Sequence, residues 1–188
     1  MPFDPAQIYA PAEDTALLLD TARREVRPTD RVLEIGTGSG VIASALATVA
    51  TSVVATDINP HAVACARQTG IDPVQCDLLS GIRGMFDLVV FNPPYLPTQP
   101  GERIDDWLEY ALDGGTTGRA VIERFAVDVG RVLAPGGRAL LLYSSLTGPK
   151  DVSAFFLDHG YSVAIMAEQN IEDEILSVVK IARLIRSR

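Results

Sequence analysis

The stretch Arg31-Val-Leu-Glu-Ile-Gly-Thr-Gly-Ser-Gly40 decides the fold class of this chain. Its first five residues are mostly apolar, which predicts a buried strand, and three closely spaced glycines follow at once. Residues 41–49 then have the pattern of a helix. A strand, a glycine-rich turn and a helix in this order form the ligand-binding edge of a parallel α/β sheet, because glycine lets the backbone approach a ligand closely.

Strand-like and helix-like segments alternate from Asp30 onward, which is typical of a parallel sheet with helices on both faces. The expected strands are residues 31–35, 52–56, 73–76, 86–91, 138–143, 161–168 and 176–184. The expected helices are residues 11–26, 41–49, 60–68, 117–133 and 150–159. The last two strands have no helical pattern between them, so we expect an antiparallel C-terminal hairpin at one edge. The sequence therefore predicts an α/β fold with a seven-stranded, mostly parallel sheet.

The spacing of the glycines indicates the kind of ligand. Gly36, Gly38 and Gly40 follow the pattern G-x-G-x-G, with Glu34 two residues before the first of them. A dinucleotide site has the pattern G-x-G-x-x-G instead. The observed pattern is that of S-adenosylmethionine sites, although a plain tight turn would also fit it.

Two acids at the ends of the next two strands favour a nucleoside ligand. Asp57 ends the second strand, where a carboxylate can accept hydrogen bonds from a ribose diol. Asp77 follows the third strand, where an acid can meet the adenine amino group. Either acid alone is equally consistent with an ordinary turn or loop residue. Together with Glu34 they place three acids at the ends of three successive strands, which predicts a shared site.

The motif Phe91-Asn92-Pro93-Pro94-Tyr95 follows the fourth strand and is the most informative part of the chain. Its two prolines stiffen the backbone and lack N–H donors, which leaves carbonyls that only accept hydrogen bonds. Asn92 adds a side-chain amide oxygen beside the Pro93 carbonyl, and Tyr95 adds a flat ring. Such a site fits a planar NH2 group, so we expect Asn92, Pro93, Pro94 and Tyr95 to bind the substrate.

Length, composition and charge exclude several classes of protein. The 188 residues, 47% hydrophobic and 21% charged, predict one globular domain over residues 1–188. The 24 acidic and 16 basic side chains give a net charge of −8, which argues against binding nucleic acid. No run reaches the ~18 apolar residues of a membrane span, and the N-terminus lacks the pattern of a signal peptide. Two cysteines without C-x-x-C spacing predict neither a disulfide framework nor a metal site, so we expect a cytoplasmic protein.

These motifs resemble those of a known family. The glycine pattern, Asp57 and Asn92-Pro-Pro-Tyr95 are similar to class I S-adenosylmethionine-dependent methyltransferases that methylate amino groups. Tyr9-Ala-Pro-Ala-Glu-Asp-Thr-Ala-Leu-Leu-Leu19 resembles the N-terminal signature of HemK-like glutamine methyltransferases of the archaeal and eukaryotic type, which are related to PrmC. Two further segments match, Gly114-Gly-Thr-Thr-Gly-Arg119 and Glu174-Ile-Leu-Ser-Val-Val-Lys180. The resemblance covers nearly the whole chain.

The resemblance implies a Rossmann-like class I methyltransferase fold, with S-adenosylmethionine as the cofactor. It also implies that the substrate is the glutamine of the Gly-Gly-Gln motif of a class I translation release factor. Residues 1–29 would contribute to both sites, and Asn92, Pro93 and Tyr95 would catalyse methyl transfer without a metal. The residues implied around the cofactor are Thr15, Glu34, Gly36, Gly38, Gly40, Asp57, Asp77, Leu78 and Asn92.

Two further segments are candidates for contacts with other proteins. Residues 96–118 are long for a loop, and we expect them to form a wall of the substrate groove. Trp107 or Tyr110 would contact the release factor there, or else pin the loop to the body. The resemblance also implies a heterodimer with a small zinc-binding activator protein, along an apolar edge near Val53, Val54 and Val74, although a core position is favoured for these valines.

One alternative function remains open at this point. Asn-Pro-Pro-Tyr serves adenine amines as well as glutamine amides, so a nucleic-acid N-methyltransferase is the second candidate. The negative net charge and the absence of a basic cluster in the sequence count against it.

Overall fold

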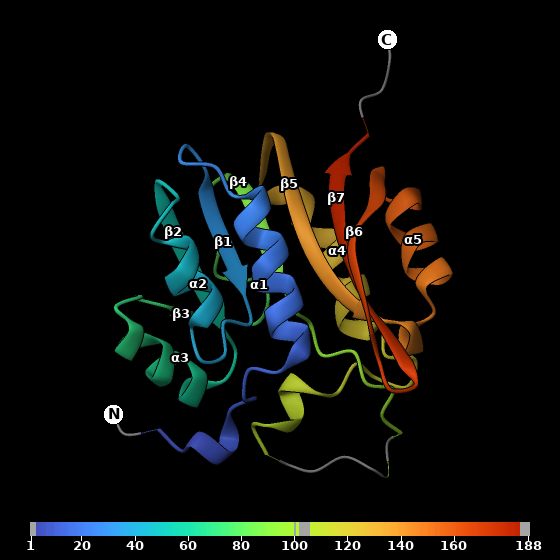
Figure 1. Cartoon of the computed structure of the whole chain (residues 1–188), viewed down its shortest axis with the longest axis horizontal. Coiled ribbons are helices and arrows are strands. Elements are labelled where there is room, and N and C mark those ends of the chain that lie inside the picture. The colour runs from blue at the N-terminus through green and yellow to red at the C-terminus, as the bar shows by residue number, and fades with distance from the viewer. Residues whose placement is uncertain (1–2, 100, 102–105, 185–188) are drawn as a thin grey trace.

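Seven strands form one mixed sheet in the computed structural model, which describes residues 3–99, 101 and 106–184. The strand order is β3-β2-β1-β4-β5-β7-β6 (Figure 1). The strands are β1 (Arg31–Ile35), β2 (Ser52–Asp57), β3 (Val74–Gln75), β4 (Phe86–Phe91), β5 (Leu133–Ser144), β6 (Tyr161–Ile171) and β7 (Glu174–Arg183). The predicted seven-stranded α/β fold is confirmed.

The first five strands run parallel to one another, and β7 is antiparallel to both of its neighbours, β5 and β6. β1 lies between β2 and β4, with Glu34 opposite Ala55 on one side and Val90 on the other. The strand order reverses between β1 and β4, and ligands of such sheets bind at the carboxyl ends of strands beside this reversal. β7 pairs with β5 and β6, which confirms the C-terminal hairpin, although its connection is only the two residues between Ile171 and Glu174.

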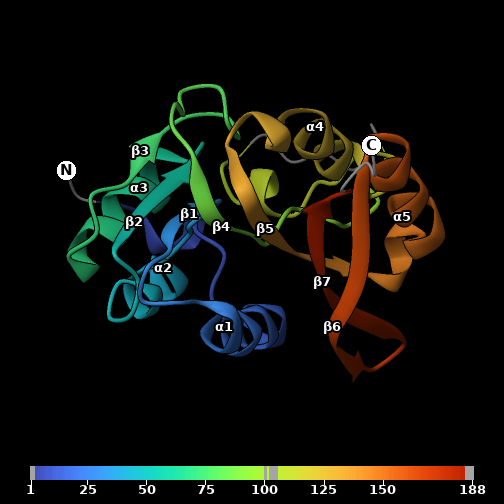
Figure 2. The same ribbon diagram turned by 90° about the horizontal axis from the view of Figure 1, so that it is seen from above.

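Helices cover both faces of the sheet. The helices are α1 (Glu13–Glu25), α2 (Val41–Leu46), α3 (Pro60–Ala66), α4 (Ala120–Asp128) and α5 (Pro149–Asp158). α1 and α2 pack on one face through Leu18 and Leu46, whereas α4 and α5 pack on the other through Phe125 and Phe156 (Figure 2). Each of these four side chains is fully buried, so each helix is held by its apolar stripe.

The helix α4 ends five residues before the end that its sequence predicts. The pattern extended this helix to Leu133, but α4 ends at Asp128 and a single 3-10 turn follows it. Leu133 instead pairs with Phe86 at the start of β5, and the register shifts before Arg138 pairs with Leu88. The glycines at 136 and 137 lie in this irregular stretch, where a Cβ at residue 137 would lie 2.8 Å from the Phe86 carbonyl oxygen. The Pro-Gly-Gly sequence therefore accommodates a bulge within the strand and does not end the helix.

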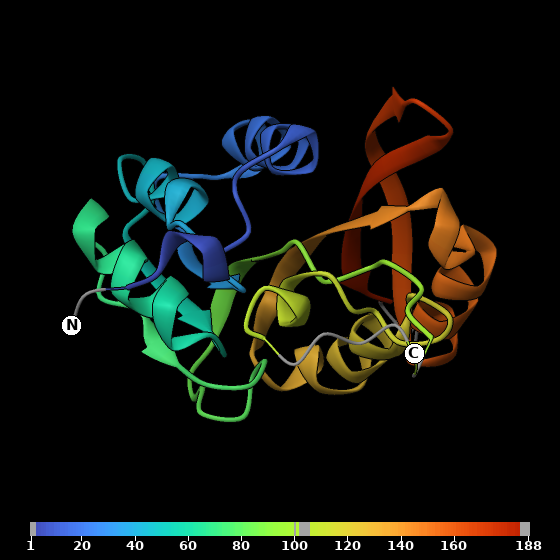
Figure 3. The ribbon, with the colours of Figure 1, turned by 90° about the horizontal axis from the view of Figure 1, so that it is seen from below.

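The carboxyl ends of β1, β2 and β4 lie at one edge of the sheet. Across this edge run the N-terminal segment, with its 3-10 turn at Pro5–Gln7, and a second 3-10 turn at Glu109–Ala111 (Figure 3). The edge is thus covered by two segments that are distant in the sequence. Among the described residues, no helix is both long and apolar enough to cross a membrane.

Candidate active site

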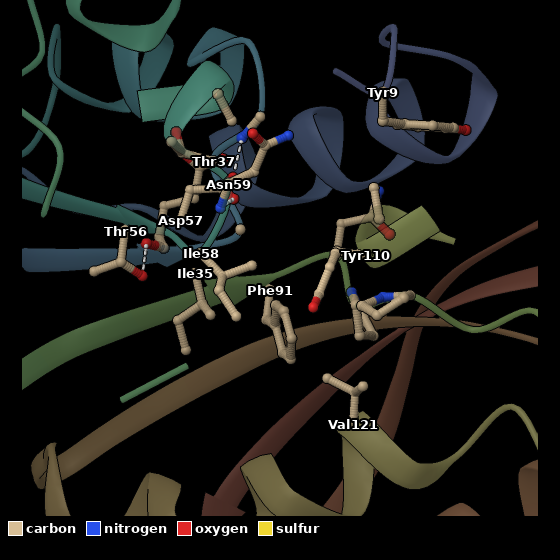
Figure 4. Close-up of a pocket in the computed structure, with 18 of the residues that line it drawn as sticks. Tyr9, Ile35, Thr37, Thr56, Asp57, Ile58, Asn59, Phe91, Tyr110 and Val121 are labelled. Carbon is tan, nitrogen blue, oxygen red and sulfur yellow. Dashed lines mark hydrogen bonds between the residues drawn. The ribbon is translucent and has the colours of Figure 1, made fainter. Parts of the chain in front are cut away.

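A cavity of about 510 Å³ lies at this edge. Asp57 and Asn59 stand at one end of it, and Tyr9 and Tyr110 stand at the other (Figure 4). The cavity brings together nearly all of the site residues predicted from the sequence. Those that line it are Thr15, Glu34, Gly36, Gly38, Asp57, Asp77, Leu78, Asn92, Pro93, Pro94 and Tyr95.

The three glycines after β1 have different structural roles. All three have positive φ angles, of +66° at Gly36, +54° at Gly38 and +83° at Gly40, which favour glycine. Gly36 and Gly38 line the cavity, and a Cβ at residue 38 would meet no atom within 4 Å. Gly40 lies outside the lining, and a Cβ there would lie 3.0 Å from Cα of Ala66. Gly40 is thus explained by the close packing of α2 on α3, whereas the other two open the wall to a ligand.

Glu34 is a buried residue that stabilises the glycine turn through hydrogen bonds. Its Oε2 accepts a hydrogen bond from Oγ1 of Thr37 at 2.6 Å and another from the backbone N–H of Ala43 at 3.0 Å. Burial raises the pKa of Glu34 to about 8, and the neighbouring Asp57 carboxylate adds to the rise. The acid therefore ties the turn to the first turn of α2.

Asp57 holds the other side of the same turn. Its Oδ2 accepts the Gly38 N–H at 2.8 Å, and its Oδ1 accepts the Asn59 N–H at 2.9 Å. Burial raises the pKa of Asp57, although these hydrogen bonds oppose the rise. The two oxygens of a carboxylate have four acceptor positions in all, so Asp57 can still accept from a ligand hydroxyl.

Asp77 lies at the rim of the cavity, beside Leu78. Its Oδ2 forms an ion pair with Nη2 of Arg124 from α4 at 2.5 Å, and both side chains are about half exposed. Leu78 has a positive φ of +46°, which is uncommon for a side chain with a Cβ and costs on the order of 1 kcal/mol. The turn after β3 is therefore held in a defined shape against α4.

The Asn92 side chain is fixed by a residue from the other end of the chain. Its Nδ2 donates to Oδ2 of Asp14, a residue of α1, at 2.9 Å. Asp14 is 3% exposed, and its Oδ1 accepts the backbone N–H of Thr15 at 2.5 Å. Because a carboxylate only accepts, the amide must turn its NH2 group toward Asp14. Oδ1 of Asn92 is then buried, and it has no hydrogen-bond partner among the described residues.

Two tyrosines complete the acceptor end of the cavity. Tyr9 and Tyr95 both line it, and burial together with the Asp14 carboxylate raises the pKa of each well above its usual value. Both hydroxyls therefore stay neutral at physiological pH. Tyr9 and Asp14 belong to the N-terminal signature, but the spacing of that signature does not reveal which side chain faces Asn92.

The described part of the segment at residues 96–118 contributes Leu96, Trp107, Tyr110, Ala111 and Leu112 to the cavity wall, and residues 100 and 102–105 lie outside the described residues. Trp107 and Tyr110 both line it, and their ring centroids are 5.2 Å apart. Tyr110 is 55% exposed, so it faces solvent as well as the cavity. The backbone N–H of Trp107 donates to Oε1 of Gln7 at 2.9 Å, and the backbone oxygen of Gln7 accepts from Nδ2 of Asn59 at 2.7 Å. Gln7, which no sequence signal marks, therefore links the Asp57 end to this wall.

The three valines at the predicted apolar edge differ in their exposure. Val74 of β3 is 43% exposed. Val53 and Val54 of β2 are partly buried and pack against the two core clusters. Of these three valines, only Val74 is thus clearly available to a partner.

Within the part of the chain that the structure describes, no three His, Cys, Asp or Glu side chains gather as the ligands of a metal would.

Comparison with known proteins places the chain in a class of enzymes. The family model "Methyltransferase small domain" matches residues 12–104. The protein MJ0928 of Methanocaldococcus jannaschii, whose name provisionally assigns it to the protein N5-glutamine methyltransferases, is 40% identical over 95% of this chain and 93% of its own length. Methyltransferase HEMK2 of Homo sapiens is 35% identical over 95% of this chain and 91% of its own.

A solved structure has the same fold. The E. cuniculi Mtq2–Trm112 complex, which is responsible for methylation of the translation termination factor eRF1, contains a chain that superposes with a TM-score of 0.79. The two are 36% identical over 94% of this chain and 99% of the other. The fold is that of a class I methyltransferase. The chain belongs to the HEMK2-type family of HemK-like protein N5-glutamine methyltransferases.

Proposed function

We propose that this protein transfers a methyl group from S-adenosylmethionine to the side-chain amide of the glutamine in the Gly-Gly-Gln motif of a class I translation release factor. The observation that carries the proposal is the buried Oδ1 of Asn92, which has no partner among the residues that the structure describes and which Asp14 holds in the orientation of an acceptor. A primary amide has two N–H donors and a planar nitrogen, and Oδ1 of Asn92 and the Pro93 carbonyl would accept both donors. The names of the relatives support the same reaction.

The residues at the Asp57 end of the cavity fit the cofactor. Gly38 leaves open space at the wall, and the Asp57 carboxylate keeps an acceptor position for a ribose hydroxyl. We assign Asp77 and Leu78 to the adenine, and Thr15, Glu34 and Gly36 to the surroundings of the remaining part of the cofactor. The glycine at 40 shapes the turn without lining the site. When bound, S-adenosylmethionine supplies an electrophilic methyl carbon on a sulfonium sulfur.

The acceptor residues activate the amide without a strong base. Hydrogen bonds from both N–H groups to Asn92 and Pro93 hold the nitrogen lone pair toward the methyl carbon and stabilise the positive charge that grows on nitrogen. The nitrogen–carbon bond forms as the carbon–sulfur bond breaks, and the sulfur keeps the electron pair. Tyr95 and Pro94 pack on the amide plane and fix its distance from the donor. The extra proton then leaves to water, so no protein group must be ionised for the step.

The proposed function also implies a partner protein and a cellular compartment. We propose that residues 1–188 act as one methyltransferase unit and that the exposed Val74 on β3 lies within the surface for a small zinc-binding activator protein, as a partner chain accompanies the E. cuniculi relative. Release factors act on cytoplasmic ribosomes, so the cytoplasm is the proposed compartment.

A labelled-methyl assay tests the proposed function. S-adenosylmethionine with a labelled methyl group is offered with release factor, with a release factor in which the glutamine of the motif is alanine, and with DNA. We expect label in the unmodified release factor alone. Label in DNA and none in release factor would favour the nucleic-acid methyltransferase and overturn the proposal.

A further inference from the structure

The turn at residues 114–118 lies directly against the acceptor motif, and the proposed reaction does not account for its glycines. Gly118 has a φ angle of +71°, and a Cβ there would lie only 2.5 Å from the backbone oxygen of Tyr95. Cγ2 of Thr147 and Cγ of Pro97 would lie at 3.3 and 3.4 Å. Because the closest atom belongs to the backbone, any side chain at residue 118 must displace Tyr95 itself.

Backbone hydrogen bonds hold the residues after Tyr95 against the same turn. The Leu96 carbonyl accepts the N–H of Gly114 at 2.9 Å, and the Thr98 N–H donates to the Gly115 carbonyl at 3.0 Å. A Cβ at residue 114 would in addition lie 2.7 Å from Cα of Gly118. Close backbone packing against the turn therefore fixes the path of the chain just after the Asn-Pro-Pro-Tyr motif.

The turn is itself anchored to the rigid body of the molecule. The Ala120 N–H, at the start of α4, donates to the Gly114 carbonyl at 2.9 Å. Nη1 of the neighbouring Arg119 donates to the Thr147 carbonyl at 2.9 Å and pairs with Asp151 of α5 at 3.3 Å. The position of Tyr95 thus depends on contacts with α4 and α5 as well as on β4.

We propose that Gly118 is a positioning residue of the acceptor site, which sets the distance of the Tyr95 ring from Asn92. The inference rests on the proposed function, since that function assigns Tyr95 to the glutamine amide. Gly118 does not line the cavity, so it acts through Tyr95 alone. Asp57 and Gly38 contact neither the turn nor Tyr95 in the described hydrogen bonds, so the cofactor end should be insensitive to a change at residue 118.

The test compares Gly118→Ala with Gly136→Ala. Gly136 has a similar φ of +76°, but a Cβ there would meet no atom within 4 Å, so it controls for backbone strain. We expect Gly118→Ala to lower kcat/KM for release factor about 10- to 100-fold, while affinity for S-adenosylhomocysteine stays within about twofold. Gly136→Ala should keep both quantities near those of the wild type. A Gly118→Ala protein as active as Gly136→Ala would overturn the inference.

A second variant decides the matter if Gly118→Ala does not fold. Pro97→Gly changes an exposed residue and adds no heavy atom, but it loosens the chain between Tyr95 and the turn. It should raise KM for release factor about threefold, with unchanged affinity for S-adenosylhomocysteine. An unchanged KM for Pro97→Gly would show that the turn has only a structural role. The same conclusion would follow if both variants lost cofactor affinity and melting temperature in parallel. No transfer by the wild-type protein would instead overturn the proposed function.

Discussion

Nδ2 of Asn92 donates to Oδ2 of Asp14 at 2.9 Å, which joins α1 to the motif that follows β4. The two residues are 78 positions apart, and the carboxylate is almost completely buried. This single contact decides which end of the amide faces the cavity. An acceptor is needed there for an amide substrate, so the N-terminal signature and the Asn-Pro-Pro-Tyr motif form one functional unit.

Asp14→Asn should impair transfer while leaving the fold intact. An asparagine at this position can donate as well as accept, so the Asn92 amide would be free to turn over. Loss of a hydrogen bond to a charged group costs about 1.5–3 kcal/mol, which lowers kcat roughly 10- to 100-fold. Affinity for S-adenosylhomocysteine, measured by calorimetry, should stay near that of the wild type. Asp20→Asn, an exposed change on the same helix, is the control, and equal kcat values for the two variants would refute the role of Asp14.

Trp107→Ala should raise KM for release factor without weakening cofactor binding. The Trp107 ring lines the cavity beside Tyr110, and its backbone is held by Gln7. Loss of a large partly buried ring from an interface costs about 1–3 kcal/mol, or roughly 5- to 100-fold in KM. Steady-state kinetics with release factor as the varied substrate measure the effect. An unchanged KM would show that the ring only pins the segment to the body.

Glu34→Gln should change how stability depends on pH. The folded protein holds this proton up to about pH 8, whereas the unfolded chain loses it near 4.5. Rising pH therefore favours the unfolded state, and Glu34 lowers the free energy of unfolding progressively between about pH 5 and pH 8. Urea titrations across this range should show a steeper loss for the wild type than for Glu34→Gln. Asp158→Asn, an exposed change on α5, should keep the wild-type slope; identical slopes for all three proteins would contradict the assignment.

Val74→Ser should weaken association with the zinc-binding activator protein. Burying an exposed valine against a partner contributes about 1.5 kcal/mol, so the dissociation constant should rise roughly tenfold. Co-expression followed by titration of the purified pair measures it. Val127→Ser is the matched control, because Val127 is 65% exposed on α4, on the opposite face from α1 and α2. Full solubility and activity of the wild-type protein without the activator would remove the need for this surface.

The sequence is informative where function depends on local spacing. The glycine turn, Asp57 and the Asn-Pro-Pro-Tyr motif each follow a strand directly, so the parallel sheet alone brings them to one edge. The length of α4 was predicted less well, because the end of that helix depends on the pairing of Leu133 with β4. Local patterns carry no information about such pairing.

Contacts between distant segments could not be predicted in the same way. Gln7 and Trp107 are 100 residues apart, and Arg124 reaches Asp77 over 47 residues. Neither Gln7 nor Arg124 belongs to a recognisable motif, and each acquires its role only when the chain is folded. The Gly114-Gly-Thr-Thr-Gly-Arg119 segment was recognised as a match to the family, but its closeness to Tyr95 is visible only in three dimensions.

The most direct test of the account is a mass measurement of the Gly-Gly-Gln peptide of release factor after incubation with S-adenosylmethionine and either wild-type protein or Asn92→Ala. The wild type should add one methyl group, which fragmentation should place on the side chain of the glutamine. Asn92→Ala should add none, although its affinity for S-adenosylhomocysteine remains within severalfold of the wild type. An unmodified glutamine with the wild-type protein, or full methylation by Asn92→Ala, would contradict it.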